Sequence, residues 1–303
     1  MRFEKLKVLI GQKINYSVFQ KVRHHEISVI KKENCKAIVQ IKSHGIRILV
    51  LNETLAEVLS FDDIQFTKDL NFSEQISQFQ FFMPESGLSE LKIEKIWFCY
   101  SAEFFCLIPE PLFSEEKAEN ALLQICDVIY PYSLKSEKLK NDAHLVFALP
   151  KAWEDWTTQL FSSSEITWIC NQSGLIEDGI KLSILMTGSI CMAQIENDHL
   201  FIGAFSNGKL LFFNRFKYKS ENDLLYFCLL VMEETGLSPE SSKFFLAGSL
   251  LPGSIGMEKL SRYFGALEFI RPLHAVEIEI EFEMIRHHNY FDLISQVAYI
   301  RSL

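Results

Sequence analysis

The residues that could do chemistry in this 303-residue sequence are few, and none forms a motif that defines an activity. The sequence has no phosphate-binding loop with a lysine, no glycine-rich dinucleotide turn that opens a helix, no Gly-x-Ser-x-Gly elbow and no His-Glu-x-x-His pair. His24-His25 and His287-His288 are adjacent pairs, and neighbours on a strand point to opposite faces. We therefore expect neither pair to chelate a metal ion, and we expect no catalytic residue.

Four glutamates alternate strictly with apolar residues, at Glu277, Glu279, Glu281 and Glu283. A period of two predicts a strand with one charged and one apolar face. The charged face could receive a basic partner or a cation, or it could be the solvent side of a half-buried strand whose charges prevent edge pairing. We favour the solvated strand, because a row of carboxylates repels itself unless a partner or solvent screens it.

The seven cysteines lie mostly inside apolar runs, and no two have the Cys-x-x-Cys spacing of zinc and redox sites. Buried free thiols behave as small apolar side chains, so we expect core cysteines in a reducing compartment. The 26 phenylalanines likewise predict an aromatic-rich core. Phe212-Phe213 and Phe244-Phe245 place one ring on each face of a strand, so helices should cover both faces of these sheets.

A formal net charge of -9 argues against a nucleic-acid binder, whose affinity comes from clustered lysine and arginine. The sequence has no run of about 18 apolar residues, which a membrane-spanning helix would need. Charges also interrupt residues 1–8, where a signal peptide would be apolar. We therefore expect neither a membrane span nor a secretory signal, and a cytoplasmic location.

A pattern that would position any site residues occurs twice in the sequence. It consists of three short apolar runs, an amphipathic helix and a further strand. The later copy has strands at 189–196, 200–205, 209–216 and 243–246 and a helix at 222–234. The earlier copy has strands at 36–42, 46–52, 57–61 and 94–100 and a helix near 72–82. Two such units facing each other would build a cleft, which is a preferred place for a ligand.

Local signals fix several boundaries in and between the copies. Asn207-Gly208 between two apolar runs predicts a tight hairpin. Ser220 followed by Asp223 predicts a capped helix that ends at Gly236, and Ser114 is the expected N-cap of another helix that buries Ala118, Ala121, Leu122 and Ile125.

The region between the copies alternates strands and helices. Strands are expected at 104–108, 143–149 and 166–170. Helices are expected from Ser114 to a point before Pro131, from Pro150 through Trp153, Trp156 and Leu160, and at about 174–186. This alternation over residues 107–186 indicates parallel strand pairing. The charged residues 133–142 have no apolar periodicity and are expected to form a linker or exposed loop. Residues 293–300 fit either a helix or a strand.

Several of these segments carry a resemblance to known families. Residues 200–205, the Asn207-Gly208 turn, 211–216, the Asp223 helix and 244–248 resemble the second domain of the pilus-assembly actin-like proteins. Residues 97–109 and 143–150 are similar to their first domain. Nearly the whole chain resembles the uncharacterised bacterial domain-of-unknown-function family 3822, through 105–109, Phe113, 147–150 and 209–216 ahead of 223–226.

The resemblance implies an α/β fold of two ribonuclease-H-like domains in an actin-like arrangement, with mixed sheets covered by helices. We expect the first domain, with an inserted hairpin and helices, over residues 1–186 and the second, with the C-terminal segment, over 187–303.

The same resemblance implies a nucleotide site in two hairpin turns and a turn after a later strand. In this sequence the corresponding residues are Ser43, Gly45, Glu196, Asp198, Gly248 and Ser249. The first turn has one glycine and no carboxylate, the second has carboxylates but no glycine, and the third keeps one glycine of a pair. Glycines let backbone N–H groups approach phosphates and an aspartate positions the metal ion, so we expect the site to be degenerate.

Three functions follow from these expectations. The first is a non-catalytic interaction or scaffold protein with an unidentified protein partner and no cofactor. The second is a weak ATP-binding conformational switch that uses Mg-ATP. The third is an enzyme with a ribonuclease-H-like metal centre built from Glu196, Asp198 and Asp223, although Asp223 already has a role as a helix cap. We favour the first.

Overall fold

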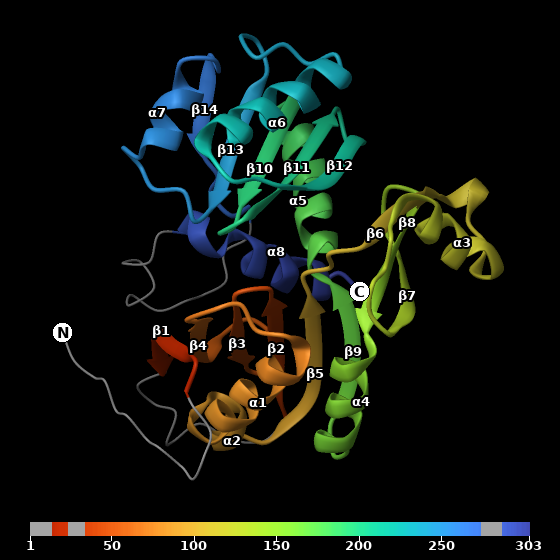
Figure 1. The fold of residues 1–303 in the computed structure, drawn as a ribbon, viewed down its shortest axis with the longest axis vertical. Helices are drawn as coiled ribbons and strands as arrows, with labels where there is room; N and C mark the ends of the chain where they lie inside the picture. Colours follow the sequence, from red (N-terminus) through yellow and green to blue (C-terminus); the bar gives the residue numbers. More distant parts are fainter. Residues whose placement is uncertain (1–13, 24–33, 274–286) are drawn as a thin grey trace. The chain divides into compact units, whose positions relative to one another are not determined.

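The computed structural model describes residues 14–23, 34–273 and 287–303, which form two compact units (Figure 1). The first unit holds the described residues up to Ser101, with 129–133 and 149–169. The second holds 102–128, 134–148 and the described residues from Cys170 onwards. The boundary expected between residues 186 and 187 concerns repeated domains, which a grouping by contacts does not test, and it stays a prediction.

The first unit contains a six-stranded sheet of order β1-β4-β3-β2-β5-β9. Its strands are β1 (Tyr16–Arg23), β2 (Cys35–Lys42), β3 (Gly45–Leu51), β4 (Val58–Phe66), β5 (Ile93–Tyr100) and β9 (Glu165–Cys170). Strands β2 and β5 run parallel, whereas β1, β4, β3 and β2 pair antiparallel in turn. The strands expected at 36–42, 46–52 and 94–100 are confirmed.

Strand β4 is longer than expected, because Asp62 and Asp63 are buried and hydrogen-bonded rather than exposed. Asp63 accepts a hydrogen bond from Arg47 at 3.2 Å, and Asp62 accepts one from the backbone N–H of Gly87 at 3.1 Å. Partners that lie far along the chain therefore keep two acidic residues inside the strand, where the sequence pattern predicts its end.

Helices α1 (Phe72–Phe82) and α4 (Lys151–Leu160) pack together in the first unit, as do the short η1 (Met83–Glu85) and α2 (Gly87–Glu90). The aromatic ring of Phe79 lies 6.2 Å from that of Trp153 and 5.4 Å from that of Trp156. Both longer helices are confirmed.

The second unit contains a five-stranded sheet of order β12-β11-β10-β13-β14. The strands are β10 (Ser189–Ile195), β11 (His199–Ser206), β12 (Lys209–Lys217), β13 (Lys243–Gly248) and β14 (Ala266–Phe269). This order matches β4-β3-β2-β5-β9 of the first unit, and in each sheet the first and fourth strands of the repeat run parallel. The predicted duplication is therefore confirmed.

Helices cover both faces of this second sheet, as the paired phenylalanines predict. Helices α6 (Glu221–Glu234) and α7 (Ile255–Ser261) pack on the face that holds Phe244. Helix α5 (Asn171–Leu185) packs on β10, β11 and β12, while α8 (Phe291–Ile300) and η4 (His287–Tyr290) pack against β13. The C-terminal segment, which fits a helix or a strand by sequence, is thus a helix.

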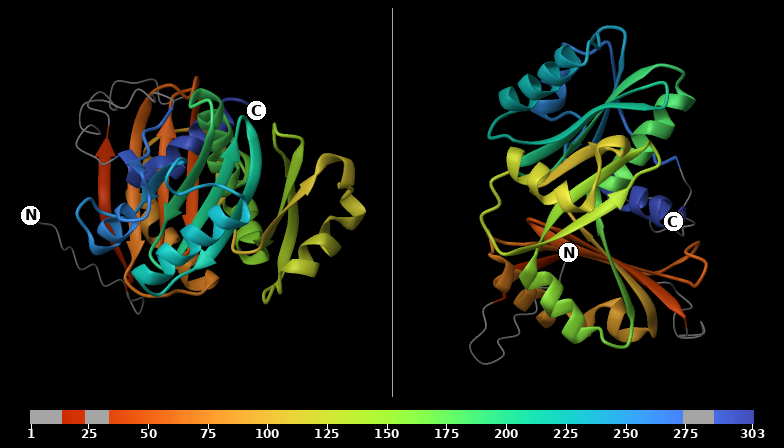
Figure 2. Two further views of the ribbon diagram at one scale, coloured as in Figure 1. Left: turned by 90° about the horizontal axis from the view of Figure 1, so that it is seen from above. Right: turned by 90° about the vertical axis from the view of Figure 1, so that its right-hand side faces the viewer.

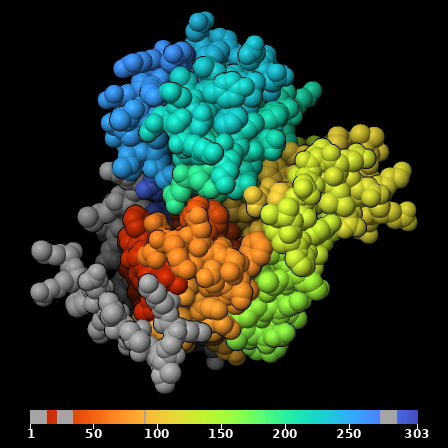
Figure 3. Space-filling view, in the orientation of Figure 1, coloured from red at the N-terminus to blue at the C-terminus, as the bar shows by residue number. Residues whose placement is uncertain are grey.

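An insert of residues 105–150 forms a three-stranded sheet of order β6-β8-β7 with helix α3 packed on β6 (Figure 2). Its elements are β6 (Phe105–Pro109), η2 (Glu110–Leu112), α3 (Glu115–Ile125), β7 (Tyr132–Lys138) and β8 (Ala143–Pro150). The insert is yellow in the space-filling view of Figure 3. Strands β6 and β8 are antiparallel, so the parallel pairing expected from residue 107 onwards is wrong for this part.

The expected linker at 133–142 is also wrong, because most of it forms β7. The carboxylate of Glu137 accepts hydrogen bonds from the backbone N–H of Cys170, from Ser173 at 2.7 Å and from the Tyr299 hydroxyl at 3.2 Å. Burial raises the pKa of Glu137 to about 7, although these donors oppose the shift. The hydrogen-bond partners of Glu137 are distant in the sequence, so a local pattern does not reveal that this residue lies in a strand.

Most local signals are confirmed. Asn207 and Gly208 have φ of 48° and 80°, which suits a tight hairpin, and Ser220 with Asp223 forms a capping box. Ser114 precedes α3 without a side-chain capping bond. All seven cysteines are free and all but Cys126 are buried.

The structure can be compared with the expectations for the two adjacent histidine pairs and the alternating glutamates only where it describes these residues. His287 and His288 lie in the η4 turn rather than in a strand, which corrects the geometry assumed for this pair. His24-His25 and the glutamates from Glu277 to Glu283 lie outside the described residues.

Candidate functional site

The turn between β10 and β11 is closed by an internal set of charged side chains. His199 is buried, with Nε2 at 3.2 Å from Glu196 Oε2 and Nδ1 at 2.8 Å from Asp198 Oδ1. The backbone N–H of Glu196 donates to the carbonyl of His199 at 2.8 Å, so the turn is also closed by its backbone. One imidazole therefore bridges both carboxylates that the sequence assigns to a phosphate site.

Neighbours of this turn reinforce the closure. The Tyr218 hydroxyl donates to the Glu196 carbonyl at 2.7 Å, and Lys217 Nζ lies 3.8 Å from Asp198 Oδ2. Burial opposes the charged form of His199, but its hydrogen bonds to the Asp198 and Glu196 carboxylates and the charge of Glu196 outweigh burial and raise the pKa of this histidine. Both carboxylates thus have a histidine partner within the protein.

Gly248 and Ser249 lie beside the same turn, at the end of β13. Gly248 pairs with Ile195 in the parallel ladder, and the backbone N–H of Ser249 donates to the Ile195 carbonyl at 2.9 Å. Gly248 has φ of +90°, and a methyl group at its Cα would overlap the Ile195 carbonyl oxygen. The glycine is therefore required by the approach of two strands.

Four of the six predicted site residues are thus brought together at one end of the second sheet. Glu196 follows Ile195 directly, and Gly248 and Ser249 contact Ile195 from the neighbouring strand. Sequence reasoning missed His199, although a histidine three residues after Glu196 and next to Asp198 was a signal for the pairing.

The other two predicted residues, Ser43 and Gly45, lie in the β2–β3 turn of the first unit. The carbonyl of His44 accepts the backbone N–H of Phe66 at 2.8 Å. A methyl group on Gly45 would overlap the carbonyl oxygen of Ile64, so this glycine allows β4 to approach closely. A nucleotide role for these six residues stays a prediction.

Asp223 serves the start of α6. Its carboxylate accepts the backbone N–H groups of Lys219 at 2.9 Å and Ser220 at 3.1 Å, and these hydrogen bonds lower its pKa. Across the part of the chain that the structure describes, no three His, Cys, Asp or Glu side chains are grouped to hold a metal ion. Nor does any helix in that part combine the length and apolarity needed to cross a membrane.

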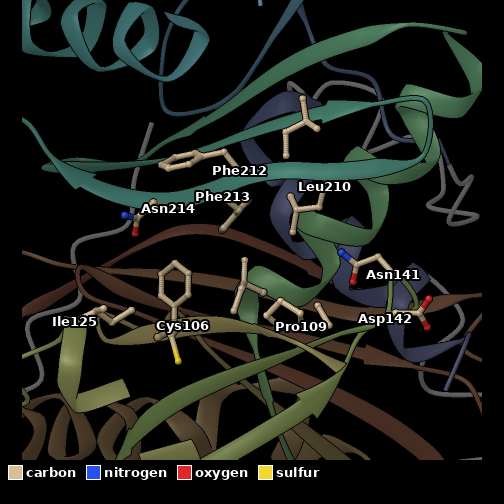
Figure 4. A pocket seen from close by; sticks show the side chains of 13 residues that line it. Cys106, Pro109, Ile125, Asn141, Asp142, Leu210, Phe212, Phe213 and Asn214 are labelled. Atoms are coloured by element: carbon tan, nitrogen blue, oxygen red, sulfur yellow. The ribbon is translucent and has the colours of Figure 1, made fainter. Parts of the chain in front are cut away.

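A groove of about 460 Å³ lies elsewhere in the second unit, between β6 of the insert and β12 of the five-stranded sheet (Figure 4). Figure 4 shows side chains of the two strands meeting across it, with Asn214 at one end and Asn141 and Asp142 at the other. Sequence reasoning missed this groove because its walls come from strands about a hundred residues apart.

Comparison with known proteins identifies the family. The model of a family described as "Protein of unknown function (DUF3822)" matches residues 24–267, which is most of the chain. The chain belongs to the DUF3822 family. A comparison with curated protein sequences gives no match.

Solved structures show which fold this DUF3822 protein has. A Bacteroides thetaiotaomicron protein of actin-like ATPase fold and unknown function matches with a TM-score of 0.70 and 18% identity, over 88% of this chain and 97% of that one. The PilM-PilN type IV pilus biogenesis complex matches with a TM-score of 0.57 and 12% identity, over 86% and 97%. The DUF3822 chain thus has the actin-like ATPase fold, and the expected fold class is confirmed.

Proposed function

We propose that this protein is a non-catalytic, actin-like interaction or scaffold protein of the cytoplasm, with a nucleotide site that has degenerated. The observation that carries the proposal is His199, which occupies both carboxylates of the second hairpin turn. The free, mostly buried cysteines support the cytoplasmic assignment, because thiols persist in a reducing compartment.

Phosphate binding by a turn needs backbone N–H groups that point outward and space for the phosphate to approach. Here the N–H of Glu196 is bonded inside the turn, and that of Ser249 is bonded to the Ile195 carbonyl. Two carboxylates beside a phosphate would also repel it unless a cation intervened. These contacts support a turn that has lost its phosphate grip.

A structural relative that occurs in a protein complex supports an interaction role. A protein of the same fold occurs in the PilM-PilN complex of type IV pilus biogenesis. We propose that the present chain likewise acts by binding another protein, and we do not assign it the partner of that complex.

The alternative is a weak ATP-binding switch. It is favoured by the adjacency of Glu196, Asp198, Gly248 and Ser249 at one sheet end, where Asp198 is partly exposed. In that case Asp198 would place the magnesium ion of Mg-ATP, and the backbone near Gly248 and Ser249 would meet the adenosine.

Thermal unfolding with and without about 5 mM Mg-ATP separates the two functions. A ligand that binds only the native state stabilises it by about 2.7 kcal/mol at a hundred times its Kd. We expect no shift relative to magnesium chloride alone and no phosphate release. A rise of the midpoint that Asp198→Asn abolishes would instead establish the switch.

A further inference from the structure

The groove between β6 and β12 is bounded on both sides by edge strands. Strand β12 is the outer strand of the order β12-β11-β10-β13-β14, and β6 is the outer strand of β6-β8-β7. Consecutive residues of each line the groove, 105–107 from β6 and 210–214 from β12. An edge strand presents backbone donors and acceptors that can pair with an added strand.

The pairing of β6 shows which of its backbone groups face the groove. The N–H of Ala148 donates to the carbonyl of Phe104, so Phe104 and every second residue after it bond to β8. The backbone groups of Leu107 therefore point away from β8, towards the open edge. Pro109, which has no N–H, ends the usable part of this edge.

The same argument applies to β12. The N–H of Tyr218 donates to the carbonyl of Asp198, so residues 216, 214 and 212 bond to β11, while Arg215 and Phe213 face outward. The N–H of Arg215 is accordingly bonded to the side chain of Asn214 at 2.8 Å. A register shift at Leu211 ends the regular edge, so Phe213 offers the outward N–H and C=O.

Apolar side chains form part of the groove lining, and some of them are exposed. The Phe105 ring lies 6.1 Å from that of Phe213 and 6.5 Å from that of Phe201. Leu211 is 45% exposed and Ile125 of α3 is 69% exposed, although the sequence pattern predicts that Ile125 is buried. Exposed apolar side chains that no other described residue covers, beside strand edges that no described strand pairs with, favour a protein ligand.

The end of the groove at the β7–β8 turn is polar. The side-chain carbonyl oxygen of Asn141 is enclosed and has no hydrogen-bond partner among the described residues. Asp142 beside it is exposed, and in the described part of the chain it has no ion-pair partner. A buried acceptor without a donor costs free energy that an incoming N–H group would recover.

We propose that this groove binds an extended segment of a partner protein, which adds as a strand along the exposed edges at Leu107 and Phe213. Its alternate apolar side chains contact Phe105, Leu211 and Ile125, and a lysine or arginine lies at the Asp142 end. This inference rests on the proposed interaction function and names its surface and the chemistry of the partner. A helical ligand satisfies its own backbone and would leave the strand edges unpaired, so the edges favour an extended one.

The test begins with a displayed library of random decapeptides selected on the full chain. We expect selected peptides with alternating apolar residues and a basic residue near one end. Their affinity should fall at least tenfold for Leu211→Lys and for Ile125→Glu. The matched control is Ile255→Glu, since Ile255 is 64% exposed on α7, outside the groove, and it should leave the affinity unchanged.

Hydrogen exchange then distinguishes strand addition from mere apolar contact. A bound peptide should slow exchange of the Leu107 and Phe213 amides, and Asp142→Lys should weaken peptides with the basic residue. The proposal would be overturned by peptides that bind Leu211→Lys, Ile125→Glu and Asp142→Lys as tightly as they bind the wild type. Peptides that bind without protecting either amide would also overturn it. So would a failure to select any peptide, or self-association of the chain that Leu211→Lys abolishes, which would make a second copy the occupant.

These outcomes are independent of the nucleotide experiment. A Mg-ATP shift would remove the assignment of a degenerate nucleotide site and leave peptide binding unaffected. A loss of peptide binding would remove the groove proposal and leave the closed hairpin turn as it is.

Discussion

The β2–β3 turn of the first unit and the β10–β11 turn of the second occupy equivalent places in two copies of one strand order, yet they are held in different ways. The first is held mainly by backbone contacts, because β4 crosses close to Gly45 and bonds to His44. The second is held by side chains, because His199 lies between Glu196 and Asp198.

This difference shows that a repeated fold fixes the place of a turn without fixing its chemistry. Each glycine that the sequence assigns to phosphate binding has a structural reason within its own sheet. The charges in the second turn have partners inside the protein. The comparison therefore predicts that substitutions in the second turn act through electrostatics, and those in the first through sterics.

Removal of His199 should have the largest effect. His199→Ala leaves the buried Glu196 carboxylate without its histidine partner. Breaking a buried pair in this way costs about 4 kcal/mol of unfolding free energy. His44→Ala in the first turn should cost less than about 1 kcal/mol, because its partner Asp69 is almost fully exposed. Urea unfolding of both variants measures the difference, and equal losses would remove the contrast between the turns.

The pH dependence checks the cause of that loss. Because the folded state raises the pKa of His199, its stabilisation is complete below the ordinary histidine pKa and is lost as pH rises through the folded value. The stability difference between wild type and His199→Ala should shrink with rising pH. A constant difference would indicate lost packing only.

Gly248→Ala should have the next largest effect, a loss of about 3 kcal/mol of unfolding free energy. The backbone of residue 248 has a positive φ that strains an alanine, and the added methyl group would overlap the Ile195 carbonyl oxygen. Gly236→Ala is the matched control, since Gly236 also has positive φ but open space around it, and it should cost about 1 kcal/mol. Chemical unfolding measures both, and a similar cost for the two would show that strand approach does not select the glycine.

Glu137 sharpens the comparison, because it is a partly buried carboxyl that has no ion-pair partner among the described residues. Its pKa of about 7 means that its contribution to stability is present at low pH and is lost as pH rises through neutrality. Glu137→Gln should therefore gain about 2 kcal/mol relative to wild type between pH 5 and pH 8. Unfolding curves at the two pH values measure this gain, and an unchanged difference would mean that the carboxyl titrates normally.

Asp198→Asn should have the smallest effect, about 0.5 kcal/mol, because this carboxylate is partly exposed and an amide can still accept from His199. Thermal unfolding measures it against Asp69→Asn in the first unit. A loss as large as that of His199→Ala would show that Asp198, rather than Glu196, is the principal partner of the histidine.

Much of the fold could be predicted because its signals are local. The Asn207-Gly208 turn and the Ser220 capping box need only neighbouring residues, and both are present as expected. Strand β7 could not be predicted, because Glu137 is compatible with a strand only through Cys170, Ser173 and Tyr299, which are far along the chain.

The candidate site likewise has features that the sequence predicts and features that depend on tertiary packing. The sequence by itself determined the repeated order of strands and helices, and it determined which residues stand in the turns, because periodicity and turn chemistry act over a few residues. Only the tertiary structure decided that His199 is buried against its carboxylates, that β4 approaches Gly45, and that β6 and β12 face each other across a groove. Burial and strand edges arise when distant segments pack, and no local pattern records them.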